Sequence, residues 1–239
     1  MGQLLMRGML AGLLAALLAF SFAKVYGEPQ VDRAITFEEH QHSHSGNAEE
    51  PELVSREVQA SIGLFTGVVV FGTALGGLFA LAYAFVGGRL VHFPPRTTAI
   101  LIAVLGFLAV YIVPYLKYPA NPPAVGDPDT ITYRTQLFFG MIAFSIAAMA
   151  IAISAGRQFA DKLGGWNAIL AGGAIYVVLT ALAAYMLPPI NEVPKTFPAD
   201  LLWNFRVVSF GIQGILWIGI GLVFGLLTDR ALGRKAHLS

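Results

Sequence analysis

The stretch A-S-I-G-L-F-T-G-V-V-V-F-G-T-A-L-G-G-L-F-A-L-A-Y-A-F-V, residues 60–86, contains no charged side chain. A helix needs about 20 consecutive apolar residues to cross a bilayer core of about 30 Å, and this stretch is long enough. None of the windows of this kind contains a lysine or an acid, and their only arginine is Arg7. We therefore predict an all-α, polytopic transmembrane bundle, with residues 1–239 as a single transmembrane domain. Its six helices fall at roughly 4–23, 60–86, 98–116, 136–156, 166–187 and 207–227.

The composition favours a membrane protein over a soluble one. Of the 239 residues, 56% are hydrophobic and 12% are charged, whereas soluble domains carry roughly 25% charged residues. The charges lie in short clusters between the apolar windows. The chain has no cysteine, which excludes a disulfide framework and a thiolate metal site. A net charge of +1 gives no reason to expect nucleic acid as a partner.

The first window has a second interpretation. Arg7, the apolar run 8–20 and the small residues Ser21 and Ala23 resemble a signal peptide followed by its cleavage site. Cleavage would leave five helices and would not alter the topology of the rest of the chain.

The loops on the two sides of the predicted bundle differ in charge. The side that holds both termini carries eight Lys or Arg and two acids, and the other side carries seven Lys or Arg and twelve acids in longer loops. Basic residues favour the cytoplasm. We therefore expect both termini to be cytoplasmic, and the acidic, histidine-containing loop 24–58 to be periplasmic.

A short pattern recurs at the end of each outer loop, where a proline and an acid precede an arginine that opens the next helix. This spacing predicts three tandem helical hairpins. Asp129 and Asp200 are expected to complement the helix dipole and to pair with the arginine that follows each of them, Arg134 or Arg206; the functional alternative is a carboxylate-lined mouth over the bundle. The instances are Pro51-Glu52…Arg56, Pro128-Asp129…Arg134 and Pro198-Ala199-Asp200…Arg206, on helices that end inside at Arg89, Arg157 and Arg230. Close helix contacts are predicted at Gly63/Gly67, Gly72/Gly76 and Gly221/Gly225.

The loop 24–58 contains the most specific local feature, His40-Gln41-His42-Ser43-His44, directly after Glu38 and Glu39. Alternation by two places the three imidazoles on one side of an extended segment, and imidazole suits zinc, nickel, copper and related ions. We predict that His40, His42, His44, Glu38 and Glu39 bind a divalent cation loosely and concentrate it at the membrane surface. The competing interpretation is a solvated linker in which the histidines are incidental.

The chain lacks the motifs of membrane enzymes and ATPases. It contains no G-x-x-x-x-G-K-[ST] phosphate loop, no H-E-x-x-H zinc motif and no cysteine. We therefore expect neither catalysis nor a permanently bound cofactor, and an intramembrane enzyme is the least favoured of the functional classes.

Four segments are more specific than composition: G-E-P-Q-V-D-R-A-I-T-F-E-E at 27–39, L-K-Y-P-A-N-P-P-A-V-G-D-P at 116–128, N-E-V-P at 191–194 and L-W-N-F-R at 202–206. Together they resemble the CbtA family of predicted cobalt transporter subunits, and the resemblance spans nearly the whole chain. It implies a bacterial inner-membrane protein of cobalt uptake for cobalamin synthesis. It also implies a partner, the small single-span, histidine-containing subunit CbtB.

Two functions follow from these observations. The first is a transporter subunit whose outer histidines and acids collect a divalent cation, cobalt by the resemblance, which the bundle then passes inward. The second is a membrane scaffold or metal-presenting accessory without transport activity of its own. A homo-oligomer is compatible with either function. The first function faces a difficulty, because ion paths usually contain an intramembrane carboxylate or histidine and the predicted windows contain none.

Overall fold

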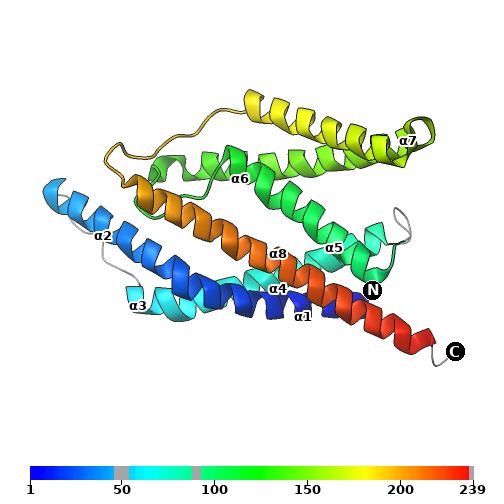
Figure 1. The fold of residues 1–239 in the computed structure, drawn as a ribbon. Helices are drawn as coiled ribbons and strands as arrows, with labels where there is room; N and C mark the ends of the chain where they lie inside the picture. Colours follow the sequence, from blue (N-terminus) through cyan, green and yellow to red (C-terminus); the bar gives the residue numbers. More distant parts are fainter. Residues whose placement is uncertain (46–53, 88–92, 237–239) are drawn as a thin grey trace. The chain divides into compact units, whose positions relative to one another are not determined.

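The computed structural model describes residues 1–45, 54–87 and 93–236 (Figure 1). The regular elements in these ranges are all helices, which confirms the all-α prediction. Short π-helical turns (η1, η2 and η3) interrupt the first three long helices, and η4 is a 3₁₀ turn. In chain order the elements are α1 Gly2–Phe22, η1 Ala23–Gly27, α2 Glu28–Ser45, α3 Arg56–Val58, η2 Gln59–Gly63, α4 Leu64–Val86, α5 Pro95–Gly106, η3 Phe107–Ile112, α6 Val113–Lys117, η4 Pro128–Thr130, α7 Ile131–Met186 and α8 Ala199–Ala236.

Five helices in the described part of the chain are long and apolar enough to cross a membrane, which confirms a polytopic membrane fold. One of them, α7, contains two of the predicted windows and leaves helical geometry at Gly164, where φ is 76° and ψ is 158°. The count of six spans and the tandem hairpins therefore stay predictions. The five ranges are Gly2–Gln41, Arg56–Val86, Pro95–Lys117, Pro128–Met186 and Ala199–Leu232.

The contacts divide the chain into two compact units, each described by itself below. Unit 1 consists of Met1–Phe107, Asn121–Ala124 and Thr196–Ser239, and unit 2 consists of Leu108–Ala120 and Val125–Lys195. This division does not test whether the whole chain is a single transmembrane domain, which stays a prediction.

In unit 1, α1 and α4 run antiparallel with their backbones in contact. A Cβ atom added at Gly76 would collide with the carbonyl oxygen of Gly8, and one added at Gly12 would collide with the carbonyl oxygen of Gly72. Small residues allow helices to approach this closely in a membrane, where packing rather than the hydrophobic effect drives association. The predicted contact at Gly72/Gly76 is confirmed; its partners on α1, Gly8 and Gly12, were not predicted.

The helix α8 packs on both α1 and α5 in the same unit. A Cβ atom added at Gly221 would lie 2.6 Å from the Cβ of Ala103, and one added at Gly225 would lie 3.2 Å from the Cβ of Ala99. These distances confirm the predicted contact of this glycine pair. The buried side of α8 continues with Leu216, Ile220 and Phe224, which are at most 1% exposed.

The predicted contact at Gly63/Gly67 is wrong. Both glycines are exposed, and a Cβ added at Gly67 would meet no atom within 4 Å. Gly67 precedes Gly72 by five residues, and at about 100° per residue this places it about 140° around the helix from the side that contacts α1.

In unit 2, the two halves of α7 fold back on one another at Gly164. The Ser145 and Tyr176 hydroxyls are hydrogen-bonded at 2.8 Å in the buried contact between the halves. Ala148 and Ala152 pack around Tyr176 in the same contact. The two predicted windows of α7 are therefore antiparallel neighbours.

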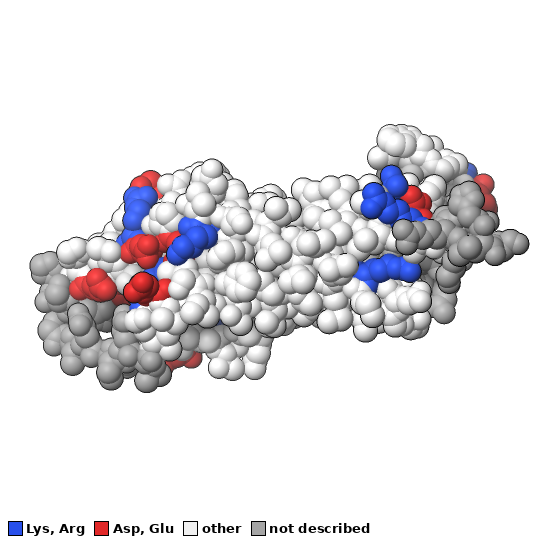
Figure 2. Space-filling model, turned by 90° about the horizontal axis from the view of Figure 1, so that it is seen from below, with Lys and Arg blue, Asp and Glu red and all other residues white. Residues whose placement is uncertain are grey.

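On the face drawn in Figure 2, the charged side chains gather at the two ends of the long helices. One group lies toward α2 and α3, the other lies toward the two chain ends, and the surface between them is uncharged. This is the distribution expected for helices that cross a bilayer, because charged groups are costly inside it.

Candidate metal-capture site

The histidine segment belongs to α2, so the prediction that it is extended is wrong. α2 continues α1 through the π-helical turn η1 and runs to Ser45. Glutamate, glutamine and alanine in this range are good helix formers, and no glycine follows until Gly46. These residues favour continuation of the helix, and the alternation of histidine with other residues does not make the segment extended.

The helical register separates the five predicted metal ligands. At about 100° per residue, positions 40 and 44 lie about 40° apart, while position 42 lies about 160° from position 40. His40 and Glu39 are exposed and Glu38 is half-buried. The side chains of His42 and His44 lie outside the described residues. Among the described residues, no three His, Asp or Glu side chains are close enough to hold a metal ion.

One side of α2 carries carboxylates that are already neutralised. Arg56 of α3 forms ion pairs with Glu28 and, at 2.9 Å, with Asp32, which lies one helical turn further along α2. Glu28 is only 8% exposed. Because one guanidinium occupies both carboxylates, these two acids connect α2 to α3 and are not open ligands for a cation.

A second side of α2 contacts the segment that leads into α8. Arg33 pairs with Asp200 at 3.1 Å, and the Gln41 amide donates to the Thr196 hydroxyl at 3.0 Å. Between these contacts, the rings of Phe37 and Phe197 meet edge to face with centroids 5.0 Å apart. The end of α2 that carries His40 is therefore attached to the start of α8.

Arg134 and Arg206 do not pair with Asp129 and Asp200, the acids that precede them, so that part of the prediction is wrong. Arg56 pairs with Glu28 and Asp32, Arg134 pairs with Glu192, and Arg206 donates to Asn121 Oδ1 at 2.9 Å. All of these partners lie on segments distant in sequence, because each arginine reaches toward a neighbouring element. Two members of the pattern, Glu52 and Arg89, lie outside the described residues.

The carboxylate-lined mouth stays a prediction, and the structure shows what surrounds the two aspartates of the pattern. Asp200 is paired with Arg33. Near Asp129, the capping side chain is that of Asp127, which accepts a hydrogen bond from the Asp129 amide at 2.9 Å.

Glu192 connects the two proline-rich loops of unit 2. Its carboxylate accepts hydrogen bonds from the Asp127 amide at 2.8 Å and the Thr130 hydroxyl at 2.7 Å, and it pairs with Arg134 at 3.3 Å. The Asp127 hydrogen bond, the Thr130 hydrogen bond and the Arg134 charge, in that order of effect, hold the pKa of Glu192 below its ordinary value. Gly126, at φ 127°, lies beneath the Arg134 guanidinium, where a side chain would collide.

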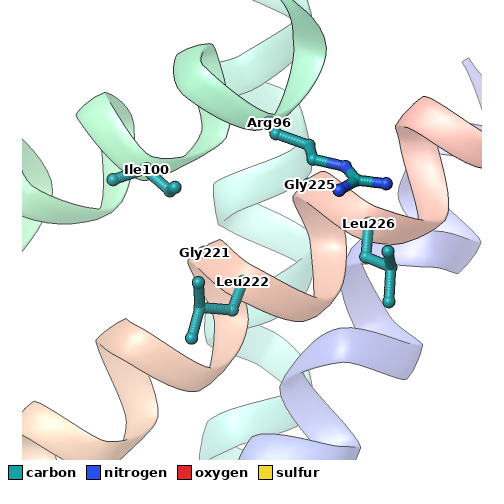
Figure 3. A pocket seen from close by; sticks show the side chains of 6 residues that line it. All are labelled: Arg96, Ile100, Gly221, Leu222, Gly225 and Leu226. Carbon is teal, nitrogen blue, oxygen red and sulfur yellow. The ribbon is translucent and has the colours of Figure 1, made fainter.

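The end of unit 1 that carries Arg96 and Asp229 contains a pocket that does not suit a cation. It has a volume of about 260 Å³ and lies between α5 and α8 (Figure 3). Its one charged lining group is the Arg96 guanidinium, which pairs with Asp229 at 2.7 Å. The other lining residues are apolar: Ile100, Gly221, Leu222, Gly225 and Leu226.

The residues that sequence reasoning missed are the ones that hold α2. Glu28 and Asp32 are one turn apart, and Arg33, Phe37 and Gln41 follow one another at intervals of one turn. That spacing is the available signal of a helix with two contacting sides. The interpretation of residues 24–58 as a loop makes no use of this spacing.

Comparison with known proteins identifies the family. No curated protein and no solved structure matches the chain. The profile of one family, described as "Probable cobalt transporter subunit (CbtA)", matches residues 1–229. The match runs from α1 to Asp229 in α8 and includes all the contacts described above. The chain therefore belongs to the CbtA family, the probable cobalt transporter subunits.

Proposed function

We propose that the chain is a bacterial inner-membrane subunit that carries a divalent cation, cobalt in keeping with the family description, from the periplasm into the cytoplasm. The observation that carries this proposal is the family match over residues 1–229. The helices long enough to cross a membrane support it.

We place the collection of the cation at the C-terminal end of α2. His40 and Glu39 are exposed there, whereas the acids nearer the membrane, Glu28 and Asp32, are occupied by Arg56. Positions 40 and 44 have the one-turn spacing at which two helical histidines bind one metal ion in the H-E-x-x-H motif. This register makes His40 and His44 the primary pair, with His42, Glu38 and Glu39 supplying further attraction nearby.

The path through the bundle must then rely on neutral oxygen atoms. A π-helical turn interrupts the regular backbone hydrogen bonding of a helix, and such turns occur frequently at functional sites. The Ala60 carbonyl, in η2, accepts a hydrogen bond from the Lys24 ammonium at 2.8 Å, so a backbone oxygen at this turn is accessible to a cationic group. The membrane potential supplies about 2.3 kcal/mol per charge per 100 mV, and a divalent ion gains twice that on entry.

A second candidate is an accessory that presents the metal ion to another protein. It is favoured by one observation, namely that no group of three metal-binding side chains occurs in the described part of the chain. The family description as a subunit implies a partner. We propose a small single-span, histidine-containing subunit of the CbtB type, which would add imidazoles to the site. Assembly of several copies of the chain is compatible with both candidates.

Replacing His40, His42 and His44 together with alanine should reduce cobalt uptake at limiting cobalt and change it little at high cobalt. The reason is that the cluster raises the local cation concentration and is not the path. Uptake of radioactive cobalt by cells, wild type beside the triple variant, measures this. The difference should shrink as the outside pH falls, because protonated imidazole does not bind metal.

The control for this variant is the amount of chain in the membrane, determined by immunoblotting. Alanine is a good helix former, so α2 should persist and the amount should stay the same. Identical uptake curves at every cobalt concentration would contradict capture by the histidines.

A reporter domain fused after Ser239 should behave as cytoplasmic, because the side of the membrane with both termini carries eight Lys or Arg near its helix ends, against seven in the longer loops of the other side. A reporter that is active in the cytoplasm and one that is active in the periplasm, fused to the same position, test the orientation. Periplasmic activity would contradict it and would place the histidines of α2 on the cytoplasmic side.

A further inference from the structure

We infer that Arg33 and Asp200 are positioning residues for cation capture, because they anchor the stripe Arg33–Phe37–Gln41 of α2 to the segment Thr196–Asp200. The stripe holds the histidine-bearing end of α2 over the start of α8. This inference rests on the proposed function, and it adds a role for residues that touch no cation themselves.

The contacts along the stripe occur in register. Arg33, Phe37 and Gln41 succeed one another by one helical turn, and their partners are Asp200, Phe197 and Thr196 in the reverse order along the chain. The two segments therefore run antiparallel. An ion pair at one end, two aromatic rings in the middle and a hydrogen bond at the other end define a single alignment of the two segments.

One ring of the aromatic pair in the middle of this contact is buried. Phe197 is 7% exposed, and Ala34 and Leu201, which follow the two residues of the ion pair in sequence, are at most 2% exposed. Apolar burial supplies attraction without direction, whereas the ion pair and the hydrogen bond at the two ends have defined geometry. The polar contacts therefore decide where along the segment α2 is seated.

The opposite side of α2 is held independently. Glu28 and Asp32 contact Arg56 of α3, and at about 100° per residue the stripe begins about 140° around the helix from Glu28. α2 is thus fastened from two sides where it leaves α1. The stripe extends to the histidine segment, because Gln41 directly follows His40.

The contact between α2 and the segment Thr196–Asp200 also places the histidine segment next to a membrane-crossing helix. The segment Thr196–Asp200 runs directly into α8, which is long and apolar enough to cross the membrane. A cation held at position 40 is thereby kept beside the entry of a membrane-crossing helix. Without the anchor, the same histidines would still bind the cation but would present it at varying places.

The test is reversal and exchange of the charges in cells that express the full chain together with its natural partners. Arg33→Glu and Asp200→Arg should each raise the cobalt concentration for half-maximal uptake several-fold and leave the maximal rate unchanged. The double variant Arg33→Glu/Asp200→Arg should recover most of the wild-type value. Lys195→Glu, which reverses an exposed charge just before Thr196, is the matched control and should have little effect.

A second comparison separates positioning from a general loss of structure. In the background in which His40, His42 and His44 are alanine, Arg33→Glu should cause no further change, because there is no capture left to position. An equal effect in both backgrounds, or no recovery in the exchanged pair, would overturn the inference. If the charge variants do not accumulate in the membrane, Gln41→Ala and Thr196→Ala are measured in their place. Each should raise the cobalt concentration for half-maximal uptake several-fold, and an equal effect in both histidine backgrounds would again overturn the inference.

The outcomes also distinguish this inference from the proposed function. If the triple histidine variant takes up cobalt like the wild type, capture by the histidines is wrong, and the inference falls with it. If the triple variant is impaired and Arg33→Glu is not, capture stands and only the positioning role is overturned.

Discussion

Gly76→Ala is expected to lower the thermal unfolding midpoint of the chain well below that of the wild type. The added Cβ would collide with the carbonyl oxygen of Gly8 and would lie 2.8 Å from both the Cα and the amide nitrogen of Gly12. These are backbone atoms, so relief requires α1 and α4 to move apart. Overpacking of a well-packed contact costs about 1–3 kcal/mol and sometimes more, and the antiparallel contact repeats at Gly12 and Gly72.

Gly67→Ala on the same helix is the matched control. Nothing lies within 4 Å of the added methyl group, and alanine favours a helix by about 1 kcal/mol relative to glycine. Thermal unfolding of the purified variants in detergent, followed by size-exclusion chromatography, compares them. Equal midpoints for Gly76→Ala and Gly67→Ala would contradict the close contact between α1 and α4.

Arg56→Ala should destabilise the chain by about 3–5 kcal/mol, the usual cost of removing one partner of a buried ion pair. The side chain of Glu28 is 10% exposed and that of Arg56 is 26% exposed. Without the guanidinium, Glu28 must either keep an uncompensated charge in a poorly solvated position or take up a proton. The free energy of unfolding in a denaturant titration measures the loss.

Asp32→Asn provides the comparison for this prediction, because the side chain of Asp32 is 59% exposed. Exposed ion pairs contribute about 0–1 kcal/mol, so this variant should remain close to the wild type. A double variant that replaces Glu28 and Arg56 with leucine should regain much of the stability lost in Arg56→Ala, since it leaves no unpaired buried charge; Asp32 also loses its partner but is exposed to solvent. If Arg56→Ala and Asp32→Asn unfold alike, Glu28 is not held in the way described.

The membrane-spanning helices could be predicted from sequence because a long uncharged apolar run has few other outcomes. Of the three predicted glycine contacts, two are confirmed and the one at Gly63/Gly67 is wrong. Gly72/Gly76 and Gly67 have the same local appearance in the sequence. Only the position of α1 decides that the first pair is buried and that Gly67 is exposed. The four-residue spacing of Gly8 and Gly12 carried the missing signal for the partner surface on α1.

The candidate site was predicted in its residues but not in its geometry. Alternating histidines predict an extended segment, whereas the helix-forming residues before them continue α2 through His40. The recurring arginines were expected to pair locally. Arg134 instead forms an ion pair with Glu192. Asp200 pairs with Arg33, which is not part of the recurring pattern. Local spacing cannot identify such partners, because they depend on which loops meet after folding.

The most direct test of the central claim is cobalt entry into liposomes that contain the purified chain and no other protein. We expect radioactive cobalt to accumulate inside, above the level in protein-free liposomes, and to accumulate faster when the interior is made negative. The potential acts on both charges of the ion, at about 2.3 kcal/mol per charge per 100 mV. Cobalt that binds to the outside of these liposomes but does not enter at any potential would contradict transport by this chain and would favour a metal-presenting accessory.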